Sequence, residues 1–573
     1  MAKKKETKKL WLVNSALTIA GGLGYLKLKK ASKNPRKTSA ATLRGILEYA
    51  KDSEYGKKNH FAEILAAKSD DELFQLWQKN VKPNDYEDLR PYINRHKKGE
   101  ENLLFPGKPL MYATTSGTTK EPKWVPITQV YLNNVYSKMT KVWLFNFIKN
   151  RPHVYEGPIV SIVGKAVEGH AEDGTVFGSV SGVTQRDCPG FIKAMYTNPS
   201  SVYAIPDYTA RYYAIMRLSI EHDIHLVVTA NPSSVLEMQK CVDTWYDEMV
   251  KDIENGTLSD KVTISDEIRA DIAPFLKKNP ERAAELRKLK EEVGRPLFKH
   301  YWPDLQVLNT WKCGNTRVYI EKMKGFFPDG MLHQEFGYFS SECRFGLVLD
   351  ETNNTVLFPH FHYYEFVPEE DVLAPDFLND PSKLHFLQLD ELEKGKRYCP
   401  FVTTYAGMYR YCMNDLVEAS DLFVNTPTVF MVQKINGIVT MTGEKLHESQ
   451  FIGAVKQAEQ ETGLKTHFFV GFAYLEESKY HFYYEFDQDV TQEQCDAFTA
   501  KVDAILRKEN IEYDAKRASF RVGDPVGHLL VENSFDKFKA TRIAEGANDG
   551  QFKMLLLQQN EKLHDRFRKL VKE

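Results

Sequence analysis

The stretch that most restricts the fold is "YTARYYAIMRLSIEHDIHLVVTANPSSVLEM", residues 208–238. Its first half carries apolar residues at helical spacing, and an apolar, partly β-branched run follows at 224–229. Asn231-Pro232-Ser233 is then a typical start for another helix. A helix, a strand and a second helix joined by such short turns predict an α/β fold class for this part of the chain.

A different pattern begins near Gln433–Gly437 and continues to the C-terminus. There the sequence predicts a helix at 448–461, an aromatic hairpin at 466–486, a helix at 491–508, a strand around 517–531 and a helix at 534–545. This run indicates a compact α+β unit. Because 573 residues are too many for one ordinary domain, we expect at least two units, with a boundary near Gln433–Gly437.

The composition excludes several classes of protein. Hydrophobic residues make up 42% of the chain and charged residues 27%, as in soluble globular proteins. The net charge of −2 provides no general positive field, so we expect no nucleic acid partner. Seven scattered cysteines without a CxxC pair argue against a disulfide framework or a structural zinc site. They favour a reducing compartment, and we expect a cytoplasmic protein.

The first thirty residues differ from the rest of the chain. They hold an apolar run, Leu10 to Leu26, between two lysine clusters. The run is short for a membrane-spanning helix, its three glycines weaken it, and no convincing cleavage site marks a secretory signal. A helix docked on the body, peripheral or single-pass membrane attachment, and secretion all stay open. In the second case, residues 10–28 would contact the inner face of a membrane, where the lysines suit anionic headgroups.

A hydroxyl-rich loop lies in "YATTSGTTKEPKWVPIT", residues 112–128. Ser, Thr, Gly and Pro of this kind form ordinary surface turns. They also form cradles in which hydroxyls and backbone N–H groups surround a phosphate and a lysine neutralises it. The loop is not a Walker motif, because GxxxxGK[ST] is absent.

Three further motifs follow downstream. "FGYFSSEC" places Glu342 after an apolar strand, where a carboxylate could hold Mg²⁺ beside a triphosphate or simply close a polar turn. "TTYAGMYRYCMNDLVEA" contains Asp415, which could bind both ribose hydroxyls or be a turn residue. "NDGQFKMLLL" contains Lys553, which by itself reads as a surface lysine.

Together the four motifs resemble those of the acyl-adenylate-forming enzymes. Among these, the chain is most similar to the acyl-acid amido synthetases, the Gretchen Hagen auxin-conjugating family of plants, and specifically to its bacterial relatives. The similarity includes "GILEYAKDSEYGKKNHF", "YWPDL", "YYEFVP" and "TTYAGMYRY" and runs from about Asn34 to the final lysine. Four ordered motifs at these spacings favour the phosphate cradle over the surface turn.

The resemblance implies a fold and a domain organisation. An N-terminal segment, 1–33, would precede a large ATP- and acyl-acid-binding domain, 34–433, in which β-sheets are flanked by helices and accompanied by a β-barrel-like part. A smaller, mobile α+β domain, 434–573, would follow. In related enzymes the small domain rotates between reaction steps, and Gly437 suits a hinge that absorbs a change in backbone angles.

The resemblance also assigns a role to each matching residue. The residues expected at the phosphates and the metal are Ser116, Gly117, Thr118 and Thr119, with Thr115 and Lys123 in support, Ser341 at the α-phosphate and Glu342 as the Mg²⁺ ligand. The remaining roles fall to Gly314 in "WKCGNT" and Tyr338 beside the adenine, Asp415 at the ribose, Lys434 at the hinge and Lys553, which would reach into the site during adenylation.

Two features depart from the family pattern. The family usually reads Tyr-Arg-Tyr-Arg-x-Gly-Asp, whereas this chain has Cys412, Met413 and Asn414 before Asp415. The geometry of the loop before Asp415 is therefore in doubt. The apolar N-terminus is the second departure, and we expect it to affect location rather than chemistry. Outside the family motifs, His360 and His362 offer an i, i+2 pair on one face of a strand, but no third metal ligand stands at a sensible spacing.

The resemblance implies a two-step reaction that uses ATP and Mg²⁺. A carboxylic acid would attack the α-phosphorus of ATP, and an amine, an amino acid by expectation, would then attack the acyl-AMP and release AMP. We expect a monomer. Two other functions stay open: an acyl-CoA ligase with the same first step, and a non-catalytic, membrane-docked nucleotide-binding protein.

Overall fold

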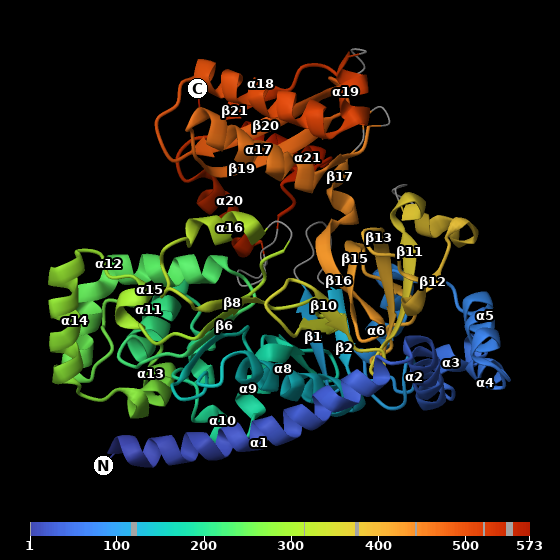
Figure 1. Cartoon of the computed structure of the whole chain (residues 1–573), viewed down its shortest axis with the longest axis horizontal. Coiled ribbons are helices and arrows are strands. Elements are labelled where there is room, and N and C mark those ends of the chain that lie inside the picture. The colour runs from blue at the N-terminus through green and yellow to red at the C-terminus, as the bar shows by residue number, and fades with distance from the viewer. Residues whose placement is uncertain are drawn as a thin grey trace.

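The computed structural model describes residues 2–115, 123–313, 316–372, 377–439, 441, 444–518, 522–545 and 554–572. Figure 1 shows an elongated body with the long helix α1 along one side and a smaller C-terminal unit above it. The architecture is mixed α/β, as predicted, and it contains several separate sheets.

A parallel sheet with the strand order β3-β6-β7-β8 forms one half of the body. Its strands are Ile159–Ile162, Leu226–Thr229, Val307–Thr310 and Leu332–Glu335. The predicted helix, strand and helix are confirmed as α11 (Tyr208–Ser219), β6 and α12 (Ser233–Asn255). The two central strands, β6 and β7, are buried along their whole length, as expected of strands covered on both faces.

A second, mixed sheet has the order β2-β1-β5-β4. Its strands are Met111–Thr115 (β1), Lys123–Ile127 (β2), Gly169–His170 (β4) and Val176–Gly178 (β5). Strands β1 and β2 are antiparallel, and Thr115 pairs with Lys123 at their open end. The hydroxyl-rich loop is therefore the connection between these two strands.

An eight-stranded, antiparallel sheet forms the other half of the body, and this is the part predicted to be β-barrel-like. Its order is β12-β11-β13-β15-β16-β10-β9, with β14 paired to β13. The strands are Gly346–Val348 (β9), Thr355–Leu357 (β10), Tyr363–Pro368 (β11), Leu387–Gln388 (β12), Arg397–Thr403 (β13), Tyr411–Cys412 (β14), Asp415–Phe423 (β15) and Thr426–Lys434 (β16).

Helices cover the sheets of the body. The first group is α2 (Pro35–Ala50), α3 (Glu54–Lys58), α4 (Phe61–Leu65), α5 (Asp70–Asn80) and α6 (Tyr86–His96). The others are α7 (Gln129–Tyr131), α8 (Ser137–Asn150), α9 (Val180–Asp187), α10 (Gly190–Lys193), α13 (Asp266–Ile272), α14 (Pro280–Val293), α15 (Phe298–Tyr301) and α16 (Arg317–Lys322).

The N-terminal segment is one helix, α1 (Ala2–Ala31), docked on α8. Gly21 permits the close approach, because a Cβ there would stand 2.3 Å from the backbone oxygen of Lys141. Tyr25 packs on Phe145, with 5.9 Å between the ring centroids. The docked-helix interpretation is thus confirmed, and Gly21 and Gly24 permit the close helix packing. No helix within the described part of the chain has both the length and the apolar character that crossing a membrane requires.

The C-terminal unit holds a four-stranded sheet with the order β21-β20-β19-β22. Its elements are β17 (Ile438–Val439), β18 (Leu446–His447), α17 (Glu448–Thr462), β19 (Thr466–Tyr474), β20 (Lys479–Phe486), α18 (Gln492–Glu509), α19 (Ile511–Ala518), β21 (Val526–Leu529), α20 (Ser534–Ala544), β22 (Leu557–Gln558) and α21 (Glu561–Arg568). The aromatic hairpin alternates its side chains between two apolar clusters, one under α17 and α18 and the other under α20 and α21.

One secondary-structure prediction in this unit was wrong. The strand expected around 517–531 is only β21, and α19 occupies the positions up to Ala518. Arg517 on α19 pairs with Asp503 on α18 at 2.9 Å, and both side chains are largely buried. This contact stabilises the helical form of 511–518, and it arises only after the two helices have packed.

Candidate active site

A cavity of about 1290 Å³ opens between the body and the C-terminal unit. Its walls come from the ends of the parallel sheet, from α8, from the segment 335–342, from β16 and from Glu448 and Met554 of the C-terminal unit. Single small-molecule sites usually measure about 300–1,000 Å³. The cavity therefore has room for a nucleotide together with a second ligand.

Helix α1 also contributes to this cavity. Ala16, Leu17 and Ala20 form part of its wall, next to Trp143 and Leu144 of α8. Docking on α8 thus brings the apolar face of α1 to the cavity. The expectation that the N-terminal segment affects location rather than chemistry stays a prediction.

Asp415 and Lys434 form the best-defined polar contact in the cavity region. They stand directly opposite each other in the antiparallel pair of β15 and β16, and the Lys434 ammonium contacts the Asp415 carboxylate. The other carboxylate oxygen accepts a 2.6 Å hydrogen bond from the Tyr338 hydroxyl. Burial lowers the pKa of Lys434, but Asp415 and then Glu342 raise it more, so its net pKa lies above the usual value.

Tyr338 is buried, and its ring stacks on Phe345 with 4.3 Å between the centroids. Its hydroxyl donates to Asp415, the residue expected to bind the ribose, and this hydrogen bond fixes the orientation of the Tyr338 side chain. Tyr338 also lines the cavity. Its expected position beside the adenine stays a prediction.

Glu342 lies in a tight turn at the cavity wall. The turn is closed by the Ser340 N–H, which donates to the Cys343 carbonyl at 3.0 Å, and by the Cys343 N–H, which donates to the Ser340 hydroxyl at 3.2 Å. The half-buried Glu342 carboxylate has no hydrogen bond or ion pair with any residue that the structure describes, and Ser341 lies beside it. A carboxylate whose oxygens have no such partner is the kind of ligand that a hard cation such as Mg²⁺ prefers.

The two ends of the hydroxyl-rich loop meet near this turn. Lys123 lines the cavity, and its ammonium lies 3.3 Å from the Tyr411 hydroxyl and over the rings of Tyr86 and Tyr411. Thr115 ends β1 opposite Lys123, and only its backbone is described. The predicted phosphate-binding residues Ser116, Gly117, Thr118 and Thr119, together with Gly314, lie outside the described residues.

Lys553 also lies outside the described residues, but the chain resumes beside the cavity. Met554 and Leu555 line its wall, and the Leu556 N–H donates to the Glu448 carboxylate at 2.5 Å. Glu448 is buried at the start of α17, and burial raises its pKa to about 7. The contact fixes the segment after Lys553 to the helix that follows the predicted hinge.

Two carboxylates at the site were missed by the sequence reasoning. Glu335, at the end of β8, is buried and accepts hydrogen bonds from the backbone N–H groups of Lys312, Cys313 and Gly337. It thereby holds the start of the "WKCGNT" loop at the cavity. An acidic residue at the end of an apolar strand was the available signal for Glu335, whereas Glu448 gave no distinctive signal.

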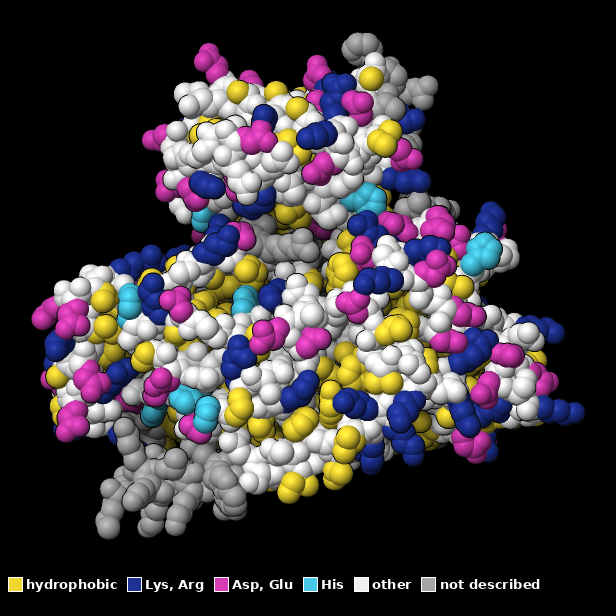
Figure 2. Space-filling model, viewed as in Figure 1, with side chains coloured by type: hydrophobic (Ala, Val, Ile, Leu, Met, Phe, Trp, Pro, Cys, Tyr) yellow, Lys and Arg dark blue, Asp and Glu magenta, His cyan; other side chains and the backbone are white. Residues whose placement is uncertain are grey.

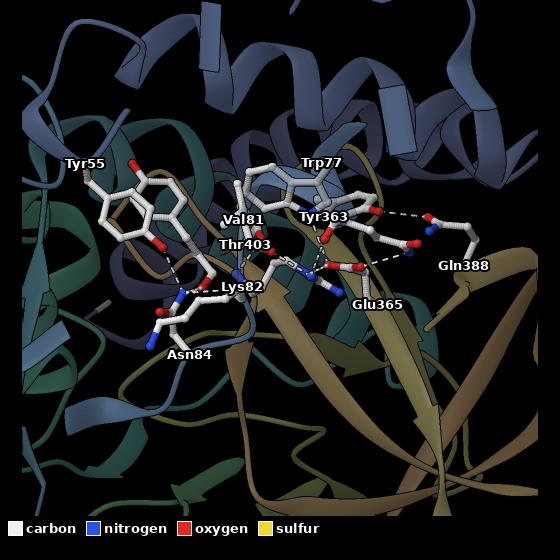
Figure 3. Close-up of polar contacts among 12 residues, drawn as sticks. Tyr55, Trp77, Val81, Lys82, Asn84, Tyr363, Glu365, Gln388 and Thr403 are labelled. Atoms are coloured by element: carbon white, nitrogen blue, oxygen red, sulfur yellow. Dashed lines mark hydrogen bonds and ion pairs between the residues drawn. The ribbon is translucent and has the colours of Figure 1, made fainter. Parts of the chain in front are cut away.

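The Tyr409-Arg410 motif supports the site from behind. Arg410 is buried and donates to Glu365 at 2.9 Å and to the Val81 carbonyl at 2.7 Å. Glu365 also accepts from Trp77 at 3.1 Å and from the Gln78 amide. Figure 3 shows how these contacts tie the helix α5 to the strand that carries Glu365.

A neighbouring set of contacts positions the backbone that leads to Asp415. The Asn84 side-chain amide donates to the Tyr409 carbonyl at 2.7 Å and to the Tyr55 hydroxyl at 2.9 Å (Figure 3). The Asn84 backbone carbonyl accepts from the Cys412 N–H at 2.8 Å. The buried contacts of the segment 409–412 therefore fix the position of the backbone at the start of β15.

The loop before Asp415 contains a residue in a left-handed backbone conformation, Asn414. Asn414 has φ 55°, in the left-handed region that favours glycine, and asparagine tolerates this region better than most residues. Asn414 thus supplies the backbone conformation that a glycine would supply at this position. Cys412 is buried against Cys399, with 3.7 Å between the sulfur atoms.

The histidine pair does not form a metal site. His360 and His362 lie in the turn between β10 and β11 rather than on a strand. His362 is buried and donates to the Arg344 carbonyl at 3.1 Å. Among the described residues, no group of three or more His, Cys, Asp or Glu side chains is arranged to hold a metal ion.

Known proteins share this fold and sequence. The chain is 24% identical over 530 residues to the 4-substituted benzoates-glutamate ligase GH3.12 of Arabidopsis thaliana, with 87% of this chain and 89% of that protein covered. It is 23% identical to the indole-3-acetic acid-amido synthetase GH3.3 of Arabidopsis thaliana, with 91% and 92% covered. The solved structure of the AtGH3.15 acyl acid amido synthetase in complex with 2,4-DB matches with a TM-score of 0.80 at 20% identity and covers 96% of each chain.

Three family models match consecutive parts of the chain. The GH3 family N-terminal domain matches residues 25–332, the central domain residues 355–434 and the C-terminal domain residues 449–562. The first model alone spans more than half of the 573 residues. The chain belongs to the GH3 family.

Proposed function

We propose that this protein is an ATP-dependent acid–amino acid ligase, which adenylates a carboxylic acid and transfers the acyl group to the amine of an amino acid. The observation that carries the proposal is the position of Lys434 and Glu342 on one wall of a cavity large enough for two ligands, with Asp415 paired to Lys434. Glu342 has no ion pair with any of the described residues. The relatives are amido synthetases and an acid–glutamate ligase, which supports the same reaction class.

In the first step, a carboxylate oxygen attacks the α-phosphorus of ATP, and pyrophosphate leaves. Asp415 orients the nucleotide, because a carboxylate has about four acceptor positions and Tyr338 and Lys434 occupy two, which leaves the others for the ribose hydroxyls. Ser341 and Lys123 hold the phosphates. Glu342 would hold Mg²⁺, which would offset negative charge on the phosphate oxygens.

In the second step, the amine attacks the acyl carbon, and AMP leaves. Lys434 keeps its positive charge beside Asp415 throughout, since its pKa lies above the usual value. The ammonium can thus stabilise the negative charge that remains on the departing AMP.

The domain boundary near Gln433–Gly437 completes the proposal. Strand β16 ends there, and the match to the central family domain also ends at residue 434, whereas the match to the C-terminal domain begins at residue 449. A rotation there moves Lys553 into the site for adenylation and away for amide formation. Lys553→Ala should lower adenylation by about 10²–10³-fold while largely sparing amide formation from supplied acyl-AMP. An equal loss in both steps contradicts the rotation.

ATP–pyrophosphate exchange over a panel of carboxylic acids tests the function. Exchange that depends on one class of acid supports adenylation, and its absence with every acid contradicts the proposal. Product analysis with an amino-acid mixture against coenzyme A then separates the amide former from an acyl-CoA ligase.

We also propose that the protein is a cytoplasmic monomer and that it contacts anionic membranes through the outer face of α1. Ile19, Leu23 and Leu26 are exposed there by 66%, 57% and 61%, at helical spacing, and the exposed Lys27 and Lys30 follow. Figure 2 shows apolar side chains along the edge of the molecule where α1 lies, with basic side chains next to them. This combination suits the interface of an anionic bilayer.

Sedimentation with phosphatidylserine vesicles tests the membrane contact. Leu23→Glu should release the protein from the vesicles, whereas Ile511→Glu, at an 85% exposed position in the C-terminal unit, should not. Equal binding by both variants contradicts this role of α1.

A further inference from the structure

Arg344 stands directly behind the Glu342 turn and points its side chain toward α8. It is 3% exposed, and its Nη1 donates to the Thr140 hydroxyl at 2.7 Å. The guanidinium lies over three aromatic rings, 5.1 Å from Tyr136, 5.5 Å from Trp143 and 5.4 Å from Phe339. Arg344, Thr140 and all three rings line the cavity.

Arg344 differs from the other buried arginines of the molecule. Four arginines are buried in the described part of the chain: Arg217, Arg344, Arg410 and Arg517. Arg217 pairs with Glu221 at 3.3 Å, Arg410 with Glu365 at 2.9 Å and Arg517 with Asp503 at 2.9 Å. Arg344 has no carboxylate within ion-pair distance among the residues that the structure describes, and its Nε has no hydrogen-bond acceptor.

Such a guanidinium is costly to bury. Removing a charge from water is unfavourable unless an opposite charge and hydrogen bonds replace the solvent. The aromatic rings offset part of this cost through cation–π contacts, and Thr140 satisfies one of the donors. The missing element is an anion, and the cavity is the space from which a ligand can supply it.

We propose that Arg344 binds a second anionic group of the acid substrate, so that the pocket selects a dicarboxylic acid with an apolar spacer. This inference rests on the proposed function. The reacting carboxylate cannot be the lasting partner of Arg344, because it loses its charge when it becomes the acyl group of acyl-AMP. A second carboxylate keeps its charge through both steps and can form the paired, two-pronged contact that guanidinium favours. Tyr136, Trp143 and Phe339 then pack against the apolar spacer.

Matched acids test the proposal in the ATP–pyrophosphate exchange assay. Terephthalate and suberate are compared with their monomethyl esters, which keep the shape and the reacting carboxylate but lose the distal charge. The wild-type protein should use at least one diacid with a kcat/KM at least about 10-fold higher than that of its ester. Arg344→Met should abolish this preference, and Arg344→Lys should retain part of it.

A charge-matched control is available far from the cavity. Arg287 on α14 is exposed and pairs with Glu254 at the surface. Arg287→Met loses the same charge and should keep the wild-type preference. Calorimetric binding of the diacid and its ester to the wild-type protein gives a second readout that needs no folded variant, and the diacid should bind at least about 10-fold more tightly.

The outcomes separate this inference from the proposed function. If monoacids or esters support exchange as well as the diacids do, or if the preference survives in Arg344→Met, the inference is wrong and the ligase function stands. If no acid of any kind supports exchange, the proposed function fails, and the inference fails with it.

Discussion

The region around Arg410 and the cavity wall around Arg344 both bury a guanidinium, but they differ in whether the protein supplies a carboxylate to pair with it. Arg410 donates to Glu365 and to the backbone of the α5 region, and it also lies 4.0 Å from the ring of Phe386. The Arg344 guanidinium has similar aromatic neighbours, but among the described residues its only hydrogen-bond partner is the Thr140 hydroxyl.

The carboxylates of the two regions differ in the same way. Glu365 accepts from Trp77, Gln78 and Arg410 and is 1% exposed. Glu342, at the cavity, receives no hydrogen bond from the described residues. A charge that the chain itself satisfies supports the fold, whereas a charge that it leaves unsatisfied beside a cavity marks a place for a ligand. The two regions should therefore respond to mutation in opposite ways.

The largest effect is expected on activity at Glu342. Glu342→Gln should lower ATP–pyrophosphate exchange by about 10²–10⁴-fold, because the amide neither carries the charge nor binds Mg²⁺ as the carboxylate does. Its urea unfolding curve should stay the same, since no described protein partner is lost. Glu342→Asp, which keeps the charge, should retain more activity than Glu342→Gln. Wild-type exchange in Glu342→Gln would show that the carboxylate only closes the turn.

A loss of stability is expected instead at Arg410. Arg410→Met leaves Glu365 buried without its cation, and breaking a buried pair in this way costs about 3–5 kcal/mol of unfolding free energy. Urea denaturation measures the loss. The double variant Arg410→Met/Glu365→Gln should recover part of it, because the uncompensated charge is then gone. A single variant as stable as the wild type would contradict the supporting role of this pair.

The element order was accessible from the sequence because it depends on local periodicity. The α11, β6 and α12 run and the aromatic hairpin both follow from patterns within a few residues. The strand expected around 517–531 failed where a distant partner, Asp503, stabilises the helix α19.

Residues of the site could be predicted from the sequence only where they belong to a recognisable motif. Asp415 and Lys434 stand 19 residues apart, and their contact depends on the register of β15 and β16, which includes two irregularities. No local pattern specifies that register. Arg344 and Glu448 gave no signal at all, since what distinguishes them is burial and the presence or absence of a partner. The expected roles of the hydroxyl-rich loop and of Lys553 stay predictions.

An intermediate, pH-dependent effect is expected at Glu448, where burial raises the pKa from 4.5 to about 7. Below pH 4.5 both folded and unfolded states hold the proton, and the ionisation of Glu448 contributes no pH dependence to the stability. Between pH 4.5 and 7 the unfolded state ionises first, so stability falls as the pH rises, by up to about 3 kcal/mol. Glu448→Gln should lack this loss. Urea denaturation should therefore show that the unfolding free energy of the variant, relative to that of the wild type, is higher at pH 8 than at pH 5. An equal difference at both pH values would contradict the raised pKa.

The smallest effect is expected for the unfolding free energy of Arg344→Met, and this differs most clearly from the large loss expected for Arg410→Met. Arg344→Met removes a buried cation that has no described carboxylate partner, so no opposite charge is left uncompensated. Thr140 remains satisfied, because its hydroxyl also donates to the Tyr136 carbonyl at 2.9 Å. A flexible thioether packs well against aromatic rings. The unfolding free energy of the ligand-free variant should thus lie within about 1 kcal/mol of the wild-type value or above it. Terephthalate at 100 times its wild-type Kd should stabilise the wild type by about 2.7 kcal/mol, but Arg344→Met, with a Kd about 10-fold higher, by only about 1.4 kcal/mol. If ligand-free Arg344→Met loses several kcal/mol of unfolding free energy, Arg344 supports the fold as Arg410 does, and its partner is the protein rather than a ligand.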